Sequence, residues 1–416
     1  MKDHYQVLII GGGTAGIMVA AQLKRKGTKA DIAIVEPSKY HWYQPAWTLV
    51  GAGTFNYTAT RREEASVIPA GVNWIQDKVT RLLPDENAVE TGSSGKLTYD
   101  YLVVAPGLVN DYSLLEGLEE ALAKGVACSN YIDPGYTWEC LQRFNGGNAL
   151  FTQPATPIKC GGAPQKIMYL AADYFRKKGL SGKTNMIFAT PGTVIFGVKQ
   201  VADTLTGVLN RYHVHFKPFY TPVKIDADNK LVHFKLTGGE YHIQEGNILK
   251  EIMDGDSSVV MPFDLLHLAP PQTAPVFVKD SSLANATGWL DVNINSMRHT
   301  TYPNVFGLGD VAALPTAKTG AAIRKQAPVV VDNLIKLMDR QPADNFSYDG
   351  YSSCPLVTGY GKMVLAEFNY KNEFTPDPML KFMGVFDSYK EHWRLWMLKK
   401  YGLPYLYWNK MMKGKM

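Results

Sequence analysis

A glycine-rich turn near the start of the chain constrains its fold more than any other feature. Residues 5–27 read "YQVLIIGGGTAGIMVAAQLKRKG", an apolar run typical of a buried parallel strand followed by glycines. Gly11, Gly13 and Gly16 stand in GxGxxG spacing. The first glycine permits a tight turn, the second lets a pyrophosphate approach the backbone, and the third lets a helix pack closely on the strand. The pattern therefore predicts strand, turn and helix, with the helix ending at Gly27.

A second predicted strand, 31–35, is followed by the acid that a dinucleotide site of this kind uses. Glu36 stands where a carboxylate can bind ribose hydroxyls. The N-terminus of the helix adds N–H donors and partial positive charge for phosphates. The alternative, a glycine-rich turn without a ligand, is disfavoured because strand, helix, strand and acid are all present. The predicted contacts are Gly11, Gly12, Gly13, Thr14, Ala15, Gly16 and Glu36.

Two later segments bear on which dinucleotide is bound. "YDYLVVAPGL" (99–108) and "YPNVFGLGD" (302–310) each predict a strand that ends in glycine. This arrangement resembles the two-dinucleotide-binding flavoproteins, in which the second segment brings an acid to the ribityl-phosphate region of the flavin. The resemblance implies one FAD, which we expect to be bound non-covalently. The contacts expected from these segments are Ala105, Gly107, Gly309 and Asp310.

A cysteine stands where this superfamily normally carries its second nucleotide fingerprint. The apolar run before residue 152 leads into "TQPATPIKCGGAPQK" and not into a second GxGxxG, which argues against a pyridine-nucleotide donor. The periodicity of 165–177 predicts a helix, so Cys160 lies at or just before a helix N-terminus, where the dipole favours the thiolate. Gly161 and Gly162 would let a flat ring approach the backbone.

Longer motifs make the resemblance specific. The chain resembles the sulfide:quinone oxidoreductase family, close to the type found in mitochondria and many bacteria, on segments spread from one end to the other. These segments are "GGGTAG", "HWYQPAWTLVGAG" (41–53), "SVIPAGVNWI" (66–75), "TPIKCGGAPQKIMYL" (156–170), "YPNVFGLGD", "LPTAKTGAA" (314–322) and "SCPLVTGYGKMVLAEF" (353–368).

The resemblance implies a redox role for two cysteines. Cys160 and Cys354 match the motifs whose cysteines flank the flavin and are joined through sulfur. Hydrosulfide is expected to attack this disulfide or polysulfide bridge, two electrons pass through FAD to a membrane quinone, and the sulfane sulfur goes to an acceptor. The acceptor (sulfite, glutathione or sulfide), the quinone type and the number of bridging sulfurs are left open.

Further cofactor contacts are also carried over from the family. Lys318 matches the segment near the pyrimidine end of the flavin, where its charge would stabilise the reduced ring; the alternative is a solvated surface lysine. Gln44, Val79 and Thr319 match positions near FAD, and ordinary packing is the alternative for the first two.

The other two cysteines and the histidines do not predict a second site. Cys140, inside the expected helix "TWECLQRF", is interpreted as a small buried residue. Cys128 is left open between a further sulfur-handling thiol and packing. The chain has no CxxC, and no histidine spacing suits a metal, so no metal is expected. His213 and His215 are expected to share one face of a strand.

The C-terminal residues 388–416 predict attachment to a membrane surface. After Glu391 there is no acid and there are six Lys or Arg. Aromatic rings with basic flanks suit a helix in the membrane interface better than a helix docked on the protein's own core. Gly402 and Pro404 are expected to break this helix before a second aromatic, basic segment. The side chains expected on one face of the first helix are Trp393, Trp396, Met397 and Tyr401.

These features define a predicted architecture. We expect an α/β fold with two Rossmann-like domains and a C-terminal amphipathic membrane-docking region. The net charge of +5 comes without an arginine-rich patch, so no nucleic-acid partner is expected. The stretch 238–260 is interpreted as a surface excursion without a function. The predicted domains are 1–108 with 286–345 for FAD, 109–285 without a nicotinamide fingerprint, and 346–416 for quinone and membrane.

The predicted function is sulfide:quinone oxidation by a peripheral, monotopic membrane protein. It would lie on the cytoplasmic face in a bacterium, or on the mitochondrial inner membrane as a processed form. Two other hypotheses remain: an NADH:quinone oxidoreductase of the same superfamily, and a non-enzymatic flavoprotein that senses persulfide. The oligomeric state is left open, including a homo-oligomer.

Overall fold

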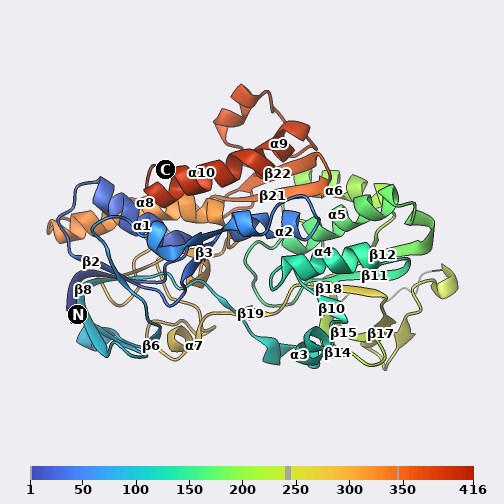
Figure 1. Ribbon diagram of the computed structural model, residues 1–416, viewed down its shortest axis with the longest axis horizontal. Helices are drawn as coiled ribbons and strands as arrows, with labels where there is room; N and C mark the ends of the chain where they lie inside the picture. The colour runs from blue at the N-terminus through green and yellow to red at the C-terminus, as the bar shows by residue number, and fades with distance from the viewer. Residues whose placement is uncertain (1, 239–244, 344–345) are drawn as a thin grey trace.

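Two mainly parallel β-sheets, one in each half of the molecule, form the frame of the structure, and C-terminal segments lie across both (Figure 1). The computed structural model describes residues 2–238, 245–343 and 346–416. The α/β fold class predicted from the sequence is confirmed.

The first sheet contains the predicted FAD-binding strands in the order β5-β2-β1-β8-β7-β6, with β20 pairing to β8. β1, β2, β5, β8 and β20 run parallel, whereas β6 and β7 add an antiparallel edge. β1 lies between β2 and β8 and is buried from Val7 to Ile10, as its apolar sequence requires. The strands are β1 His4–Ile10, β2 Ile32–Val35, β5 Asn73–Ile75, β6 Val79–Leu83, β7 Ala88–Thr91, β8 Lys96–Val104 and β20 Val305–Gly307.

Two helices pack together on this sheet. α1 (Thr14–Arg25) begins directly after the glycine turn, and α8 (Gly320–Met338) begins shortly after β20 and packs against α1. α1 ends as predicted, because Gly27 adopts a φ of +77° just beyond its C-cap. Shorter elements outside the main sheets are β3 Tyr40–Trp42, α2 Trp47–Val50, β4 Arg61–Glu63, β9 Val109–Asn110, β19 Gln272–Thr273 and α7 Val276–Lys279, of which α2 packs on helices of the other half.

The second sheet is parallel throughout, in the order β10-β18-β11-β12-β13. A smaller antiparallel sheet, β14-β15-β17-β16, lies beside it in the lower part of Figure 1. The strands are β10 Ala127–Cys128, β11 Gly147–Thr152, β12 Thr184–Ala189, β13 His215–Lys217, β14 Tyr220–Asp226, β15 Leu231–Leu236, β16 Ile252–Met253, β17 Ser258–Pro262 and β18 Leu265–Leu268. The helices of this half are α3 Leu118–Ala123, α4 Pro134–Arg143, α5 Ala163–Lys177 and α6 Lys199–Arg211.

Two local predictions in this half are wrong. The stretch 238–260 is not wholly an excursion, since β16 and the start of β17 lie in the antiparallel sheet; residues 239–244 lie outside the described residues. His213 does not share a strand with His215, because it lies in the turn after α6 with a φ of +51°.

The C-terminal region consists of a hairpin and a helical run. β21 (Ser352–Gly359) pairs with β22 (Lys362–Phe368), and the chain continues through a 3₁₀ segment, Pro378–Met383, to the final helices. Those helices are α9 Trp393–Met397, a π-helical turn Leu398–Gly402 and α10 Leu403–Asn409. Within the part of the chain that the structure describes, no helix has the length and hydropathy needed to cross a bilayer.

The predicted break at Gly402 and Pro404 is wrong. The helical path continues because the widened π turn precedes α10, and Pro404 falls in the first turn of α10, where no N–H is needed. The predicted apolar face is also only partly exposed, since Trp396 is buried.

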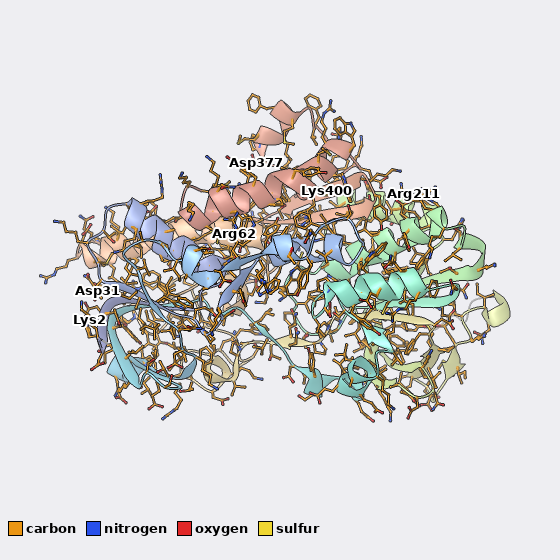
Figure 2. All side chains as sticks on the ribbon, viewed as in Figure 1. Lys2, Asp31, Arg62, Arg211, Asp377 and Lys400 are labelled. Carbon is orange, nitrogen blue, oxygen red and sulfur yellow. The ribbon has the colours of Figure 1, made fainter. Side chains whose placement is uncertain are left out.

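Two contacts tie this C-terminal region to the rest of the molecule. Arg211 pairs with Glu391 at 2.6 Å, and the Arg62 guanidinium lies 4.2 Å from the centre of the Trp408 ring; Figure 2 labels both arginines.

Candidate functional site

Cys160 lies in the loop between β11 and α5, three residues before the helix begins. Its φ of +83° falls in the left-handed region that favours glycine, and the Ala163 N–H donates to its carbonyl oxygen at 2.6 Å. Backbone strain of this kind concentrates at functional sites, where the surrounding structure holds it in place. The loop therefore presents this thiol in one fixed orientation.

The fold brings Cys354 to Cys160 across a large sequence separation. Cys354 lies in β21, which packs against α5, and is 1% exposed. The two sulfurs are hydrogen-bonded to each other. The structure thus places the two predicted catalytic cysteines in direct contact.

Two lysines surround this thiol pair, and the sequence prediction missed both. Lys166 on α5 places Nζ 3.0 Å from the sulfur of Cys160, and it is buried. Lys399, in the π turn, is 3% exposed, and its Nζ donates to the carbonyl oxygen of Pro45 at 2.8 Å. The sequence held one signal for Lys166, since it is a lysine on the buried face of the predicted helix 165–177. Lys399 stood in a segment interpreted as facing the membrane.

The environments of the two thiols shift their pKa values in opposite directions. A hydrogen bond from Cys354 and the Lys166 ammonium hold the pKa of Cys160 well below its usual range, although burial opposes this. The pKa of Cys354 is raised well above its usual range because it donates that hydrogen bond and is buried. Burial, with the nearby charge of Lys166, lowers the pKa of Lys399 to about 7. The pair is therefore a Cys160 thiolate and a Cys354 thiol.

The glycine turn between β1 and α1 is fixed by two close contacts. Gly11 has a φ of +98°, and a Cβ there would lie 2.4 Å from the carbonyl oxygen of Ala105. A Cβ on Gly16 would lie 2.0 Å from the carbonyl oxygen of Gly11. At Gly13, by contrast, nothing lies within 4 Å of the Cβ position. The turn is thus closed toward β8 and the helix and open at the position expected to face a pyrophosphate.

Glu36 is directed at this turn from the end of β2. One carboxylate oxygen accepts from the Gly12 N–H at 2.7 Å and the other from the Ser38 N–H at 2.8 Å. Burial raises its pKa, while these hydrogen bonds act in the opposite direction. Gly107 has open space around it beyond β8, and Val79 is buried at the start of β6.

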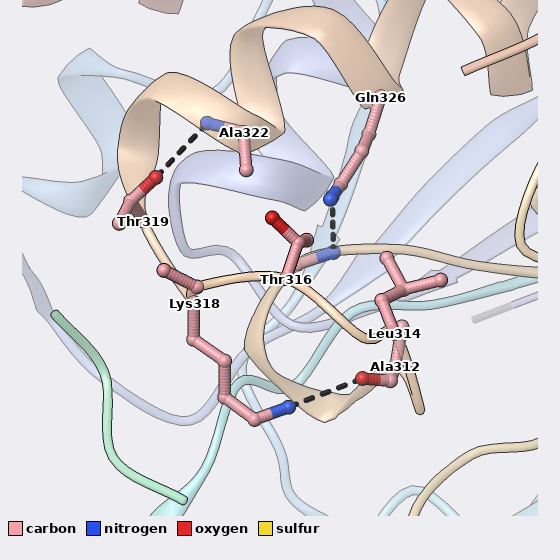
Figure 3. Close-up of a pocket in the computed structure, with 9 residues that line it drawn as sticks. Ala312, Leu314, Thr316, Lys318, Thr319, Ala322 and Gln326 are labelled. Carbon is pink, nitrogen blue, oxygen red and sulfur yellow. Dashed lines mark hydrogen bonds between the residues drawn. The ribbon is translucent and has the colours of Figure 1, made fainter. Parts of the chain in front are cut away.

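Three further predicted contacts, Gly309, Lys318 and Thr319, line a small cavity at the N-terminus of α8 (Figure 3). The Gly309 N–H donates to Gln326 Oε1 at 2.9 Å, and Thr319 caps α8 by accepting from the Ala322 N–H at 3.1 Å. The pKa of the half-buried Asp310 is raised by burial.

Lys318, beside the same cavity, is not the solvated lysine of the alternative interpretation. Its Nζ donates to the carbonyl oxygens of Asp310 at 2.6 Å and Ala312 at 3.1 Å, and lies 4.0 Å from the centre of the Trp289 ring. Burial lowers its pKa to about 8. Whether its charge faces a flavin stays a prediction.

Backbone and side-chain contacts join the thiol loop to the predicted flavin contacts. Lys159 forms a parallel β-bridge with Lys318, and its Nζ donates to Gln44 Oε1 at 2.6 Å. The Thr319 hydroxyl lies 2.8 Å from that of Ser352, two residues before Cys354. Residues predicted to contact FAD therefore border the thiol pair on both its loop and its strand.

Comparisons with known proteins agree with this arrangement. Residues 5–132 match the family model described as pyridine nucleotide-disulphide oxidoreductase. The chain is 43% identical to the mitochondrial sulfide:quinone oxidoreductase of Mus musculus, over 99% of this chain and 87% of that protein. It is 40% identical to the mitochondrial sulfide:quinone oxidoreductase of Dictyostelium discoideum, over 100% of this chain and 87% of that protein. The chain belongs to the sulfide:quinone oxidoreductase family.

A solved structure of the same family shares the fold. The sulfide:quinone oxidoreductase of the hyperthermophilic bacterium Aquifex aeolicus superposes with a TM-score of 0.75 at 21% identity, covering 98% of this chain and 92% of that one. The sequence-based resemblance to sulfide:quinone oxidoreductases is therefore confirmed. The roles of individual residues stay predictions.

The remaining two cysteines, Cys128 and Cys140, form a second contact. Cys128 is buried in β10 and its thiol donates to the Leu266 carbonyl oxygen at 3.4 Å. Cys140 on α4 is hydrogen-bonded to it and packs against the core, as interpreted from the sequence, although it is only half-buried. Among residues 2–238, 245–343 and 346–416, no group of three or more His, Cys, Asp or Glu could hold a metal.

Proposed function

We propose that this chain is an FAD-dependent sulfide:quinone oxidoreductase that works through Cys160 and Cys354. The observation that carries the proposal is the buried contact between the two sulfurs, with the Lys166 ammonium at one of them, beside residues predicted to contact FAD. A thiolate beside a thiol is what exchange with sulfide requires.

FAD is the proposed cofactor, bound non-covalently. Family membership implies a flavin, and the open space at Gly13 and Gly107 fits the close approach of a dinucleotide. Glu36 would hold the ribose and the first turn of α1 the pyrophosphate. The residues proposed to hold the cofactor are Gly11, Gly12, Gly13, Thr14, Ala15, Gly16, Glu36, Gln44, Val79, Ala105, Gly107, Gly309, Asp310, Lys318 and Thr319. Bound FAD would carry two electrons from the thiols to a quinone.

The surroundings of the two thiols suggest how they divide the sulfur chemistry. Hydrosulfide attacks the oxidised pair at Cys354, the bond to Cys160 breaks, and a Cys354 persulfide and a Cys160 thiolate result. Cys160 is the better leaving group because Lys166 lies at its sulfur. An acceptor then attacks the outer sulfur of the persulfide. Re-forming the bond between the two cysteines releases two electrons, which bound FAD would accept.

The C-terminal region would bring the enzyme to its quinone. A run of exposed apolar side chains extends from the 3₁₀ segment to α10, with Lys381, Arg394 and Lys400 among them. Apolar and basic residues together suit the surface of an anionic membrane. We propose peripheral attachment to a quinone-containing membrane, the mitochondrial inner membrane included. The exposed side chains are Met379, Phe382, Phe386, Trp393, Met397, Tyr401 and Tyr405.

Anaerobic absorbance spectra of the purified yellow protein test this function. Sulfide should bleach the flavin band and a short-chain quinone should restore it, whereas NADH should do neither. Cys160→Ser and Cys354→Ser should abolish the bleaching, and Cys140→Ser, at the other cysteine contact, should retain it. Bleaching by NADH with no response to sulfide would favour an NADH:quinone oxidoreductase. Bleaching by sulfide that quinone never reverses would favour a persulfide sensor.

A further inference from the structure

A buried chain of hydrogen bonds links the C-terminal helix to the glycine turn. The Tyr407 hydroxyl on α10 lies 2.8 Å from the Thr14 hydroxyl and 2.6 Å from His41 Nε2. His41 Nδ1 lies 3.0 Å from the carbonyl oxygen of Gly12. Tyr407 is 3% exposed and His41 is buried as well, so water does not compete for these bonds.

The donors and acceptors of this chain can be assigned in one consistent direction. The Gly12 carbonyl oxygen can only accept, so His41 Nδ1 carries a proton and donates to it. In the neutral imidazole, the other ring nitrogen accepts from the Tyr407 hydroxyl, whose oxygen accepts from the Thr14 hydroxyl. Both ends of the chain therefore lie in the turn: one on a carbonyl oxygen and the other on the first side chain of α1.

A buried carboxylate, that of Glu64, lies beside this chain of hydrogen bonds. Glu64 Oε2 lies 3.4 Å from His41 Nδ1, and its Oε1 has no hydrogen-bond partner. That oxygen lies against the turn, since a Cβ on Gly12 would meet it at 2.5 Å. An unpaired polar atom in a buried site is costly. Because Glu64 Oε1 gives the turn no hydrogen bond, the bonds of His41 and Tyr407 hold the turn on this side.

Packing places α10 firmly in this half of the molecule. The rings of Tyr407 and Tyr43 have centroids 4.6 Å apart, and the 3₁₀ turn after α10 packs against α1. Figure 1 shows α10 above α1 and α8. The same helical run carries exposed Tyr401 and Tyr405, so it has one face toward solvent and one toward the dinucleotide turn.

We propose that Tyr407 is a positioning residue for the cofactor: through Thr14 and His41 it holds the turn that receives the pyrophosphate, so that the C-terminal helix and bound FAD stabilise each other. This inference rests on the proposed binding of FAD at that turn. Coupling of this kind is reciprocal, because whatever α10 contributes to FAD affinity, FAD contributes to the docking of α10.

The test compares Tyr407→Phe with Tyr405→Phe in the full-length protein. Both changes remove one hydroxyl from α10, but Tyr405 is exposed. FAD affinity is measured by titrating the apoprotein and following flavin fluorescence. We expect Tyr407→Phe to raise the Kd for FAD about 5- to 30-fold, because two buried hydrogen bonds are lost, and Tyr405→Phe to leave it unchanged.

A double-mutant cycle separates positioning from general stability. If Tyr407 acts through Thr14, Tyr407→Phe should weaken FAD binding much less in a Thr14→Val background. An unchanged Kd together with equal losses of melting temperature in apoprotein and holoprotein would overturn the inference, because the hydroxyl would then be only structural. If Tyr407→Phe does not fold, His41→Gln tests the same chain of hydrogen bonds. An unchanged Kd for FAD in His41→Gln would overturn the inference too. A wild-type protein that binds no FAD would instead refute the proposed function.

Discussion

The ammonium group of Lys166, near the start of α5, lies 3.0 Å from the sulfur of Cys160 in the preceding loop. This contact distinguishes the two thiols, because the ammonium group lies at the sulfur of Cys160. The hydrogen bond from Cys354 and the Lys166 charge lower the pKa of Cys160, whereas that hydrogen bond and burial raise the pKa of Cys354. In the proposed reaction, the charge of Lys166 therefore favours Cys160 as the leaving group.

Replacing Lys166 by methionine should raise the pKa of Cys160. In the wild-type protein the thiolate persists to a pH well below the usual range, so alkylation of the reduced enzyme should begin at low pH. The Lys166→Met profile should move to higher pH, and the rate of flavin reduction by sulfide should fall about 10- to 100-fold. Lys166→Arg keeps the charge and should stay near wild type. Identical alkylation profiles for methionine and wild type would show that the lysine does not act on this thiol.

The glycine turn offers a matched pair of substitutions. Gly11→Ala puts a Cβ 2.4 Å from a backbone oxygen at a φ of +98°, so it should lower the free energy of unfolding by about 3 kcal/mol. Gly13→Ala meets nothing within 4 Å and should change stability by only about 0.5 kcal/mol. It should nonetheless weaken FAD binding on the order of 10-fold, because the methyl group enters the space expected to receive the pyrophosphate. Thermal melts of the apoproteins and FAD titrations check the two effects separately, and tight FAD binding by Gly13→Ala would place the pyrophosphate elsewhere.

The first unit of the fold could be predicted because its signals are local. Gly11, Gly16 and Glu36 lie within one strand–turn–helix–strand unit, where sequence spacing fixes spatial position. The contact between Cys160 and Cys354 could not be derived that way, since their separation closes only through packing of β21 on α5. Family resemblance supplied that pair.

Residues that act through long-range packing were missed for the same reason. Lys399 and Tyr407 belong to a basic, aromatic segment whose composition is typical of a membrane surface, yet both are buried. The π turn rotates part of the segment inward, and no local pattern distinguishes it from a helix that ends at Gly402. Composition thus predicts a surface role for this segment but gives no sign of the side chains that it packs in the interior.

Lys399 should make the stability of the protein depend on pH in the alkaline range. Its folded-state pKa is about 7 against 10.5 for an exposed lysine, so between these values the unfolded chain binds the proton and the folded protein does not. Stability should therefore rise as pH increases from 7 to 10.5, by a few kcal/mol at about 1.4 kcal/mol per pKa unit.

Lys399→Met should remove that dependence. The variant should melt higher than wild type at pH 7, with a difference that shrinks toward pH 10, although loss of the bond to Pro45 offsets about 1 kcal/mol. Lys400→Met is the control, since Lys400 donates to Thr54 in a partly exposed position and should show no such trend. A constant difference between Lys399→Met and wild type at all pH values would mean that this ammonium is charged in the folded protein.

The exposed 3₁₀ segment should govern membrane attachment. Phe382 is 91% exposed and Phe386 is 74% exposed, in a part of the chain that projects from the body of the molecule (Figure 1). Replacing both with aspartate removes apolar area from the proposed lipid contact and adds like charge toward an anionic membrane, so binding to anionic vesicles should fall about 100-fold in a flotation assay.

The proposed lipid contact and the thiol site involve different residues. Sulfide-dependent reduction of a water-soluble short-chain quinone should therefore persist in the double variant, whereas turnover with a long-chain quinone embedded in vesicles should be lost. Val276→Asp, at an exposed apolar residue of α7, is the control and should float like wild type. Unchanged flotation of the double variant would place the lipid contact on another face of the molecule, because losing two exposed aromatic rings from the true contact must weaken binding.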